Sequence, residues 1–213
     1  MRPLSRLLAV LGVLAVVSLA PAARADALSE QESIRLARGE TVIREHTWEP
    51  GRSARFVGGV TYTVVDAAPA EIGAMFDDVD AYRRVLPRTK RARFVGVEAN
   101  GDRLVELVQG TSLVEATYTL RVRQDSRTGA RREVRFWLEP NRPHEIDDAW
   151  GFFRMEPFTG PSGEQQVLLT YAILVDIGQG LVRELFEERV RAALLSVPQL
   201  VRRYVAEGRH PGY

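Results

Sequence analysis

The last third of the chain, residues 150–203, constrains the fold more than any other stretch. An aromatic strand begins at Trp150 and is followed by a turn at residues 160–163 and a longer apolar strand at residues 166–176. After a break at residues 178–180, an amphipathic helix runs almost to the C-terminus. A hairpin followed by one long helix suits a sheet that folds around a helix and leaves a space between them. We expect such a space to hold an apolar ligand rather than to perform chemistry.

The closing helix carries a wide apolar stripe. Its apolar residues recur mostly at spacings of three and four between Leu181 and Val205, which predicts that a broad face is buried. Pro198 lies inside this pattern. Because proline cannot donate a backbone hydrogen bond, we expect it to bend the helix, which would allow one long helix to follow a curved sheet.

Further upstream, the pattern predicts one strand and two short helices. Residues 60–65 alternate in character and predict a strand that is half buried on one face. Pro69 favours the first turn of a helix, where its missing N–H costs least. Asp80 is expected to cap a second short helix over residues 81–86, which Pro87 ends.

Four strand candidates follow, separated by turns at Asn100 and Gly101 and at residues 126–129. They are residues 91–98, 103–110, 113–123 and 132–139. In the third candidate, alternation places one apolar set on the core face: Val114, Ala116, Tyr118, Leu120 and Val122. In the fourth, Val134, Phe136 and Leu138 point inward, and Trp137 falls on the polar side, where we expect the N-terminal extension to cover it.

The first 25 residues have the pattern of a secretory signal peptide. Arg2 and Arg6 precede a 14-residue uncharged run over residues 7–20, and Ala23 and Ala25 supply small residues at a cleavage site before Asp26. The run is shorter than the roughly 20 residues that span a bilayer. We therefore expect an exported protein, periplasmic or extracellular after cleavage.

Residues 26–55 are expected to form an N-terminal extension, with a short helix over residues 28–38 and a strand over residues 41–48. Ser29 and Glu32 have the spacing of a capping box, which supports the helix better than its loose periodicity does.

Charge and composition exclude several kinds of function. The first 25 residues hold three of the 29 bases and none of the 28 acids, so the remainder has a formal net charge of −2, and no nucleic-acid partner is expected. The chain has no cysteine, which excludes disulfides, thiol catalysis and thiolate metal sites. Phosphate-binding loops, nucleophile elbows and dinucleotide fingerprints do not occur in it.

The order strand, two helices, antiparallel strands and long helix predicts an α+β fold. Three stretches resemble the START-like (SRPBCC) superfamily, in its polyketide cyclase/dehydrase, lipid-transport and coenzyme-Q-binding-type branch. They are residues 61–87, residues 150–157, and residues 169–181 together with the closing helix and its Pro198. The resemblance covers residues 56–208, so residues 26–55 lie before the START-like domain and residues 209–213 form a tail.

The resemblance implies a helix-grip fold, in which a curved antiparallel sheet wraps around a long C-terminal helix and leaves an apolar cavity. Members of the superfamily bind lipids, isoprenoids, sterols or polyketides, and a minority catalyse cyclisation or dehydration. It supplies no catalytic motif, so we assign no catalytic residue, metal ligand or cofactor. The residues expected to line the cavity are Tyr118, Leu120, Phe136, Phe152, Tyr171, Leu185, Val190, Leu194, Val197 and Val201.

Two polar clusters leave other functions open. His144 with Asp147 and Asp148 is the one group of acid–base character, in a segment that predicts a solvated loop; His46 and His210 stand apart from it. Six bases crowd into residues 83–93 and could hold an anionic headgroup or make a transient contact with a membrane surface. The bases are Arg83, Arg84, Arg88, Lys90, Arg91 and Arg93.

Three functions therefore remain: an exported carrier of a lipid or isoprenoid, an enzyme of the cyclase/dehydrase kind acting on a polyketide-like substrate, and an envelope scaffold with a collapsed cavity. A polar cluster inside the cavity would favour the enzyme. Vesicle binding that depends strongly on salt concentration would favour the scaffold.

Overall fold

The computed structural model describes residues 28–51, 54–111, 114–128 and 131–209 of the 213-residue chain. The predicted signal peptide and His210 lie outside these residues, and the turn predicted at residues 126–129 lies partly outside them. Among the described helices, none is both long and apolar enough to cross a membrane.

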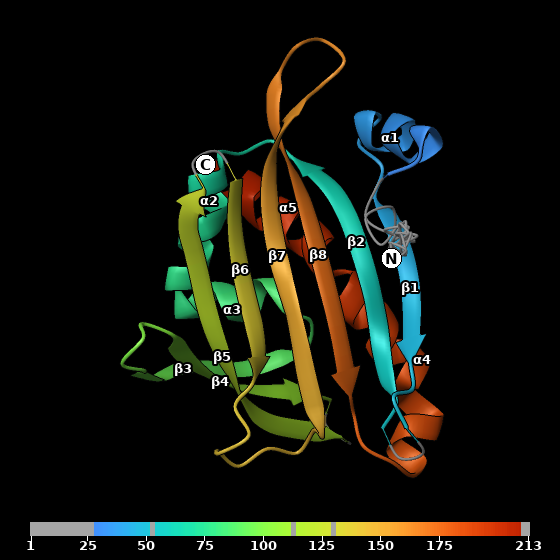
Figure 1. The fold of residues 1–213 in the computed structure, drawn as a ribbon, viewed down its shortest axis with the longest axis vertical. Coiled ribbons are helices and arrows are strands. Elements are labelled where there is room, and N and C mark those ends of the chain that lie inside the picture. The colour runs from blue at the N-terminus through green and yellow to red at the C-terminus, as the bar shows by residue number, and fades with distance from the viewer. Residues whose placement is uncertain (1–27, 52–53, 112–113, 129–130, 210–213) are drawn as a thin grey trace, which may run out of the picture.

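A single antiparallel sheet of eight strands forms the body of the molecule (Figure 1). Its strand order is β1-β2-β8-β7-β6-β5-β4-β3. The second strand, β2, therefore pairs with the last strand, β8. The strands are β1 Val42–Trp48, β2 Phe56–Val65, β3 Thr89–Val97, β4 Arg103–Gly110, β5 Glu115–Thr128, β6 Arg131–Leu138, β7 Asp148–Thr159 and β8 Gln165–Asp176.

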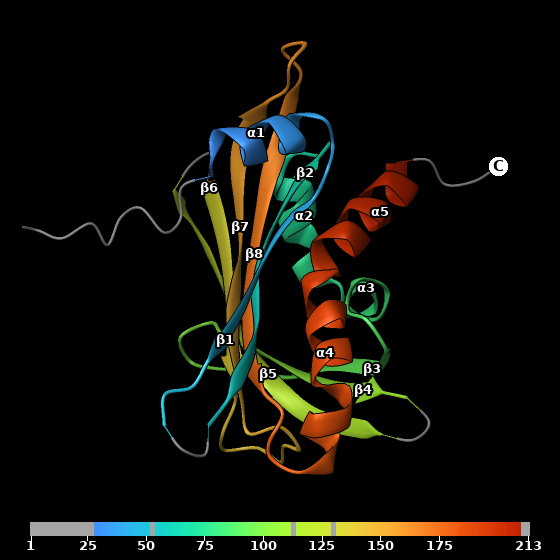
Figure 2. The ribbon, with the colours of Figure 1, turned by 90° about the vertical axis from the view of Figure 1, so that its right-hand side faces the viewer.

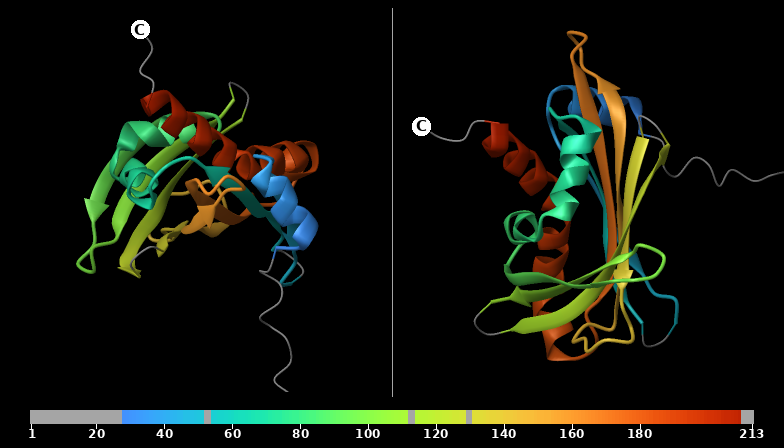
Figure 3. Two further views of the ribbon diagram at one scale, coloured as in Figure 1. Left: turned by 90° about the horizontal axis from the view of Figure 1, so that it is seen from above. Right: turned by 90° about the vertical axis from the view of Figure 1, so that its left-hand side faces the viewer.

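The helices lie mainly on one face of this sheet, as Figure 2 shows. They are α1 Glu30–Ala37, α2 Pro69–Ala74, the 3-10 turn η2 Met75–Asp77, α3 Val79–Val85, α4 Leu181–Leu195 and α5 Val197–Arg209. Figure 3 shows the sheet curving around the helices, with β3, β4 and the beginning of β5 sweeping across toward α4. The predicted α+β helix-grip architecture is confirmed.

The closing helix is broken at Ser196, as the position of Pro198 predicts. Helix α4 ends at Leu195, and Pro198 occupies the first turn of α5, where a missing N–H is tolerated. The Leu195 carbonyl instead accepts a hydrogen bond of 3.0 Å from the Thr61 hydroxyl on β2. The break therefore redirects the helix (Figure 2), and the Thr61 hydrogen bond links the end of α4 to β2.

Strand β2 is buried on both faces, so the prediction of a half-buried strand was wrong. Thr61 and Val65 face the closing helices, whereas Tyr62 and Val64 pack on the other side in a second apolar cluster with Leu36 of α1. Alternation predicts the two faces correctly, but it does not reveal that the extension covers the second one.

Two smaller expectations were also wrong. The side chain of Asp78, not Asp80, caps α3, because its Oδ1 accepts a 2.9 Å hydrogen bond from the Asp80 N–H. Trp137 is not covered by the extension: it lies opposite Trp150 in the register of β6 and β7, and the Arg123 guanidinium lies 5.3 Å from its ring centroid.

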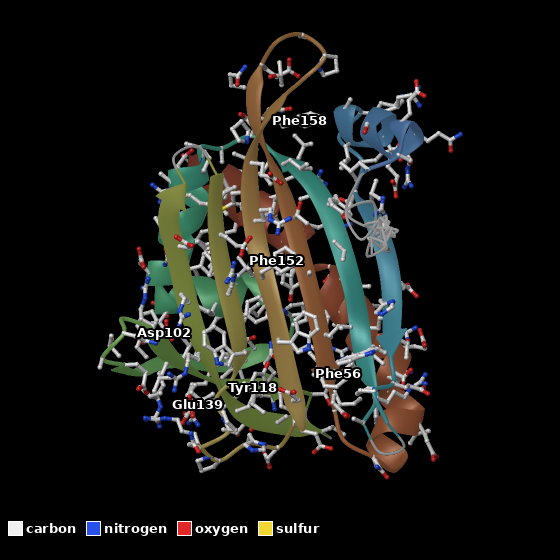
Figure 4. The ribbon with its side chains drawn as sticks, in the orientation of Figure 1. Phe56, Asp102, Tyr118, Glu139, Phe152 and Phe158 are labelled. Atoms are coloured by element: carbon white, nitrogen blue, oxygen red, sulfur yellow. The ribbon has the colours of Figure 1, made fainter. Side chains whose placement is uncertain are left out.

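Ion pairs occupy much of the outer face of β4 to β7, seen toward the viewer in Figure 4. Arg123 makes two 2.7 Å hydrogen bonds to the buried Asp102, and Arg121 pairs with Glu139. Arg154 also belongs to this face, since it pairs with Glu133 at 3.1 Å and covers the Phe152 ring. The inner face carries mostly apolar side chains.

The extension has the predicted helix and strand, and β1 pairs with β2 as the edge strand of the same sheet. The capping box of α1 is present: Ser29 N–H donates to Glu32 Oε2 at 2.8 Å, and Glu32 N–H donates to Ser29 Oγ at 3.2 Å. Glu32 also accepts two hydrogen bonds from Arg44 of β1, at 2.9 and 2.6 Å. Glu32 thus links α1 to β1. The domain boundary at residue 56 stays a prediction.

We expect a Glu32→Gln substitution to lower the free energy of unfolding by about 1 kcal/mol at pH 7. The Arg44 hydrogen bonds, and then the Ser29 N–H, lower the pKa of Glu32 to about 2. Because the folded-state pKa is depressed, ionised Glu32 stabilises the fold above its ordinary pKa of 4.5, and this contribution is lost as the pH falls toward about 2. Glutamine keeps the capping interaction and removes only the charge.

Urea unfolding of both proteins between pH 7 and pH 2.5 checks this, since their difference should shrink with falling pH. Glu40→Gln is the matched control, because the Arg35–Glu40 pair is about half exposed and should change stability little. A difference between wild type and Glu32→Gln that is the same at every pH would contradict the assignment.

Candidate ligand cavity

A cavity of about 350 Å³ lies between the concave face of the sheet and α4. The sheet side is formed by inward residues of β5 to β8, including Leu120, Val134 and Ile173. The helix side is formed by one stripe of α4, including Phe186, Val190 and Leu194. The lining is mostly apolar, as the alternation of the strands and the stripe of the helix require.

An aromatic cluster forms part of the inner wall. Phe153 of β7 lies 4.5 Å from Tyr171 of β8 and 4.8 Å from Phe76 of η2, between ring centroids. Phe136 of β6 stacks on Tyr171 at 6.1 Å. All four rings are buried and line the cavity, so a ligand would meet flat, polarisable surfaces here.

The cavity meets solvent at the end of the molecule where β4 turns into β5. Its exposed lining residues are Arg88 after α3, Glu115 at the start of β5, Glu145 in the β6–β7 loop, and Gln179 before α4. Charged side chains thus lie at the opening, and the interior is left to apolar and phenol groups. Tyr118, labelled toward the lower end of Figure 4, lies on the inner face of β5 near this opening.

Polar contacts hold α4 against the first two strands. Arg55, just before β2, donates to Glu187 of α4 at 2.8 and 2.9 Å. Arg191 of α4 donates to Glu187 at 3.1 Å and to Thr47 of β1 at 3.0 Å. The extension therefore helps to position the helix that forms one wall of the cavity.

Seven of the ten predicted lining residues lie on the cavity wall: Tyr118, Leu120, Phe136, Tyr171, Val190, Leu194 and Val197. That they contact a ligand stays a prediction. The other three do not line the cavity. Phe152 lies on the outer face beneath Arg154, Leu185 is 66 % exposed on the solvent side of α4, and Val201 is buried in the core beyond the helix break.

The wall also contains residues outside that prediction. Met75, Phe76, Tyr82 and Val85 come from η2 and α3, which also line the cavity. Gln109, at the end of β4, lines it as well. The sequence predicts that one face of the short helices is buried, but it does not predict that this face packs against β7.

Neither polar cluster forms a site in the cavity. His144 and Asp147 are exposed in the β6–β7 loop, and Asp148 is exposed at the first position of β7. None of the three lines the cavity, and His144 Nδ1 lies 2.8 Å from the Ile146 carbonyl oxygen. Across the described part of the chain, no group of three His, Asp or Glu side chains is placed to hold a metal ion.

The cluster of bases between residues 83 and 93 is largely paired with carboxylates. Arg84 pairs with Glu207 at 2.7 Å, Lys90 with Glu115, and Arg93 with Glu106 at 2.8 Å. Arg91 lies 3.9 Å from the same Glu106. These pairs reduce the positive electrostatic potential that would attract an anionic headgroup or membrane surface.

No protein-family model and no curated protein matches the sequence. Solved structures do match the fold. A STAR-related lipid transfer protein fragment from Xanthomonas axonopodis has a TM-score of 0.59 at 12% identity, covering 76% of this chain and 98% of that chain. Human STARD10 has a TM-score of 0.56 at 10% identity, covering 85% of this chain and 81% of that chain.

A START superfamily protein from Mycobacterium smegmatis gives a TM-score of 0.54 at 14% identity, covering 70% of this chain and 96% of that chain. At such identities the likeness shows the fold and not the ligand. The sheet order, the closing helix and the cavity between them agree with it. The chain has the helix-grip fold of the START-like (SRPBCC) superfamily, and the resemblance seen in its sequence is confirmed at the level of the fold.

Proposed function

We propose that this chain is an exported protein that binds or carries a hydrophobic small molecule, a lipid or an isoprenoid, in the cavity between the sheet and α4. The cavity itself is the observation that carries the proposal. Its volume of about 350 Å³ falls within the range of about 300–1,000 Å³ that is usual for ligand pockets, and its interior is apolar. The lipid-transfer title of the Xanthomonas structure supports the same class of ligand.

Energetics favour an occupied cavity. A dry apolar void costs about 24 cal/mol per Å³, so an empty space of this size would cost about 8 kcal/mol. That cost is comparable to the whole stability of a domain, about 5–15 kcal/mol. An apolar ligand removes the cost and also brings its own buried surface, at about 25 cal/mol per Å². Water entering through the polar opening is the alternative occupant.

The two other functions receive less support. A cyclase or dehydrase needs proton-moving groups near the substrate. In the described residues no histidine lines the cavity, and the carboxylates that do, Glu115 and Glu145, lie at its opening. A scaffold that acts through a basic face needs unpaired cations, and four of the six clustered bases have a carboxylate within 4 Å. Export rests on the pattern of residues 1–25.

Titration with Nile red, a neutral dye whose emission rises in apolar surroundings, tests the proposal. We expect saturable binding at one site for each chain, and displacement by unlabelled isoprenoids or single-chain lipids. Dye binding that does not saturate, or that no apolar competitor displaces, would count against a ligand cavity.

A further inference from the structure

Three tyrosines line the cavity, and they differ in how their hydroxyl groups are used. The Tyr82 hydroxyl donates to the Phe76 carbonyl oxygen at 3.2 Å. The Tyr118 hydroxyl is bonded to the Gln109 side chain. Within the described residues, the Tyr171 hydroxyl has no hydrogen-bond partner. A buried hydroxyl without a partner is costly, so Tyr171 calls for an explanation.

The Tyr171 oxygen faces the cavity and is not enclosed by packing. The residue is only 2 % exposed, and its ring lines the cavity between Phe136 and Phe153. In the part of the chain that is described, Arg191 Nε is the one fully enclosed polar side-chain atom without a partner. The Tyr171 oxygen is therefore in contact with the open space of the cavity, where its proton is available to a bound molecule.

Tyr118 presents the opposite hydrogen-bonding character. The Gln109 amide nitrogen donates to Thr89 Oγ1 at 2.8 Å and to the Pro87 carbonyl oxygen at 3.2 Å. These bonds use both amide protons and leave only the Gln109 carbonyl oxygen toward Tyr118. Tyr118 must therefore donate its proton to Gln109, and the lone pairs of its own oxygen remain able to accept.

The two phenols belong to one neutral site. Burial raises the pKa of Tyr118. Burial is also the main cause that raises the pKa of Tyr171, and the nearby Tyr118 raises it further. Both phenols therefore remain protonated. The charged lining residues, Arg88, Glu115 and Glu145, lie at the opening. An anionic group beside the phenols would lose its hydration without gaining a cation.

We infer that Tyr171 and Tyr118 recognise a hydroxyl group on an otherwise apolar ligand: the Tyr171 O–H donates to the ligand oxygen, and the Tyr118 oxygen accepts the ligand proton. The ligand class is accordingly a neutral apolar alcohol, in preference to the corresponding hydrocarbon or carboxylate. The inference rests on the proposed function, because it requires a ligand in this cavity.

Competition against Nile red with three probes of the same carbon skeleton tests the inference: farnesol, farnesene and farnesoate. For wild type we expect farnesol to bind about 3- to 10-fold more tightly than farnesene, the usual effect of one or two net hydrogen bonds, and farnesoate to bind more weakly than farnesol. Tyr171→Phe should bring farnesol close to the farnesene value and leave farnesene unchanged. Tyr118→Phe should also weaken farnesol selectively.

Tyr204→Phe is the matched control, because Tyr204 of α5 lies beside Arg84 and does not line the cavity. It should leave all three affinities unchanged. Equal binding of farnesol and farnesene by wild type, or an equal loss of both in Tyr171→Phe, would overturn the inference while leaving a ligand cavity in place. Failure of wild type to bind any of the three would overturn the proposed function and the inference together.

Discussion

An Ala193→Trp substitution is expected to weaken ligand binding by at least about tenfold, equivalent to about 1.4 kcal/mol, while the protein stays folded. Ala193 is a small, half-buried residue on the stripe of α4 that lines the cavity. An indole at this position would project into the space that the ligand needs. Because it fills a void, it should leave the melting temperature unchanged or raise it. Nile red titration and thermal unfolding measure the two effects.

Ala192→Trp supplies the matched control, since Ala192 is adjacent on α4 but exposed to solvent. The same side chain is added there outside the cavity, and binding should remain at the wild-type level. If Ala193→Trp bound apolar dyes as tightly as wild type, the ligand would not occupy the space between α4 and the sheet.

A Gly58→Ala substitution is expected to lower the free energy of unfolding by about 3 kcal/mol or more, the largest stability effect that we predict. Gly58 lies on β2 with a φ of +156°, a conformation that strains a residue with a side chain. A Cβ atom there would lie 1.9 Å from the Ile173 carbonyl oxygen of β8. The substitution would separate β2 from β8, the pair that joins the extension side of the sheet to the cavity wall. Urea unfolding measures the loss.

Gly96→Ala on β3 is the control for this effect. A Cβ atom at Gly96 would meet only Leu104 Cδ1, at an ordinary contact distance of 3.7 Å. We expect this variant to change stability by less than about 1 kcal/mol. If both variants lost a similar amount of stability, the close approach of β2 to β8 would not be the reason that residue 58 must be glycine.

Much of the fold could be predicted because its determinants are local. Alternation in β5 places Tyr118 and Leu120 on the inner face, and proline at position 198 marks the break between α4 and α5. The Ser29–Glu32 capping box identifies α1 although its periodicity is weak. In each case the physical cause acts within a few residues of the chain.

The assignment of Phe152 failed for a reason that the sequence itself contains. Phe152 shares its strand face with Arg154 and Glu156, whereas Phe153 shares its face with Met155. The charged pair indicates the outer face, so Phe153 is the residue that the alternation favours for the cavity. Because Phe152 and Phe153 are both aromatic, residue type alone does not show which of them faces the cavity.

Other features of the site depend on contacts between distant segments. Leu185 belongs to the apolar stripe of α4, yet it lies about 100° around the helix from Phe186 and faces solvent. Phe76 lines the cavity because η2 packs against β7, and Gln109 lines it because the curved sheet carries β4 toward α4. No local pattern specifies that curvature, so these residues could not be predicted.

Native mass spectrometry of the full chain, isolated from cells that process its N-terminus, tests the central claim most directly. We predict the mass of a chain that begins at Asp26, together with one apolar adduct for each chain. Extraction should identify the adduct as a lipid or isoprenoid, and the Ala193→Trp variant should not retain it. A wild-type protein that carries no adduct and takes up none from a panel of lipids and isoprenoids would contradict the account.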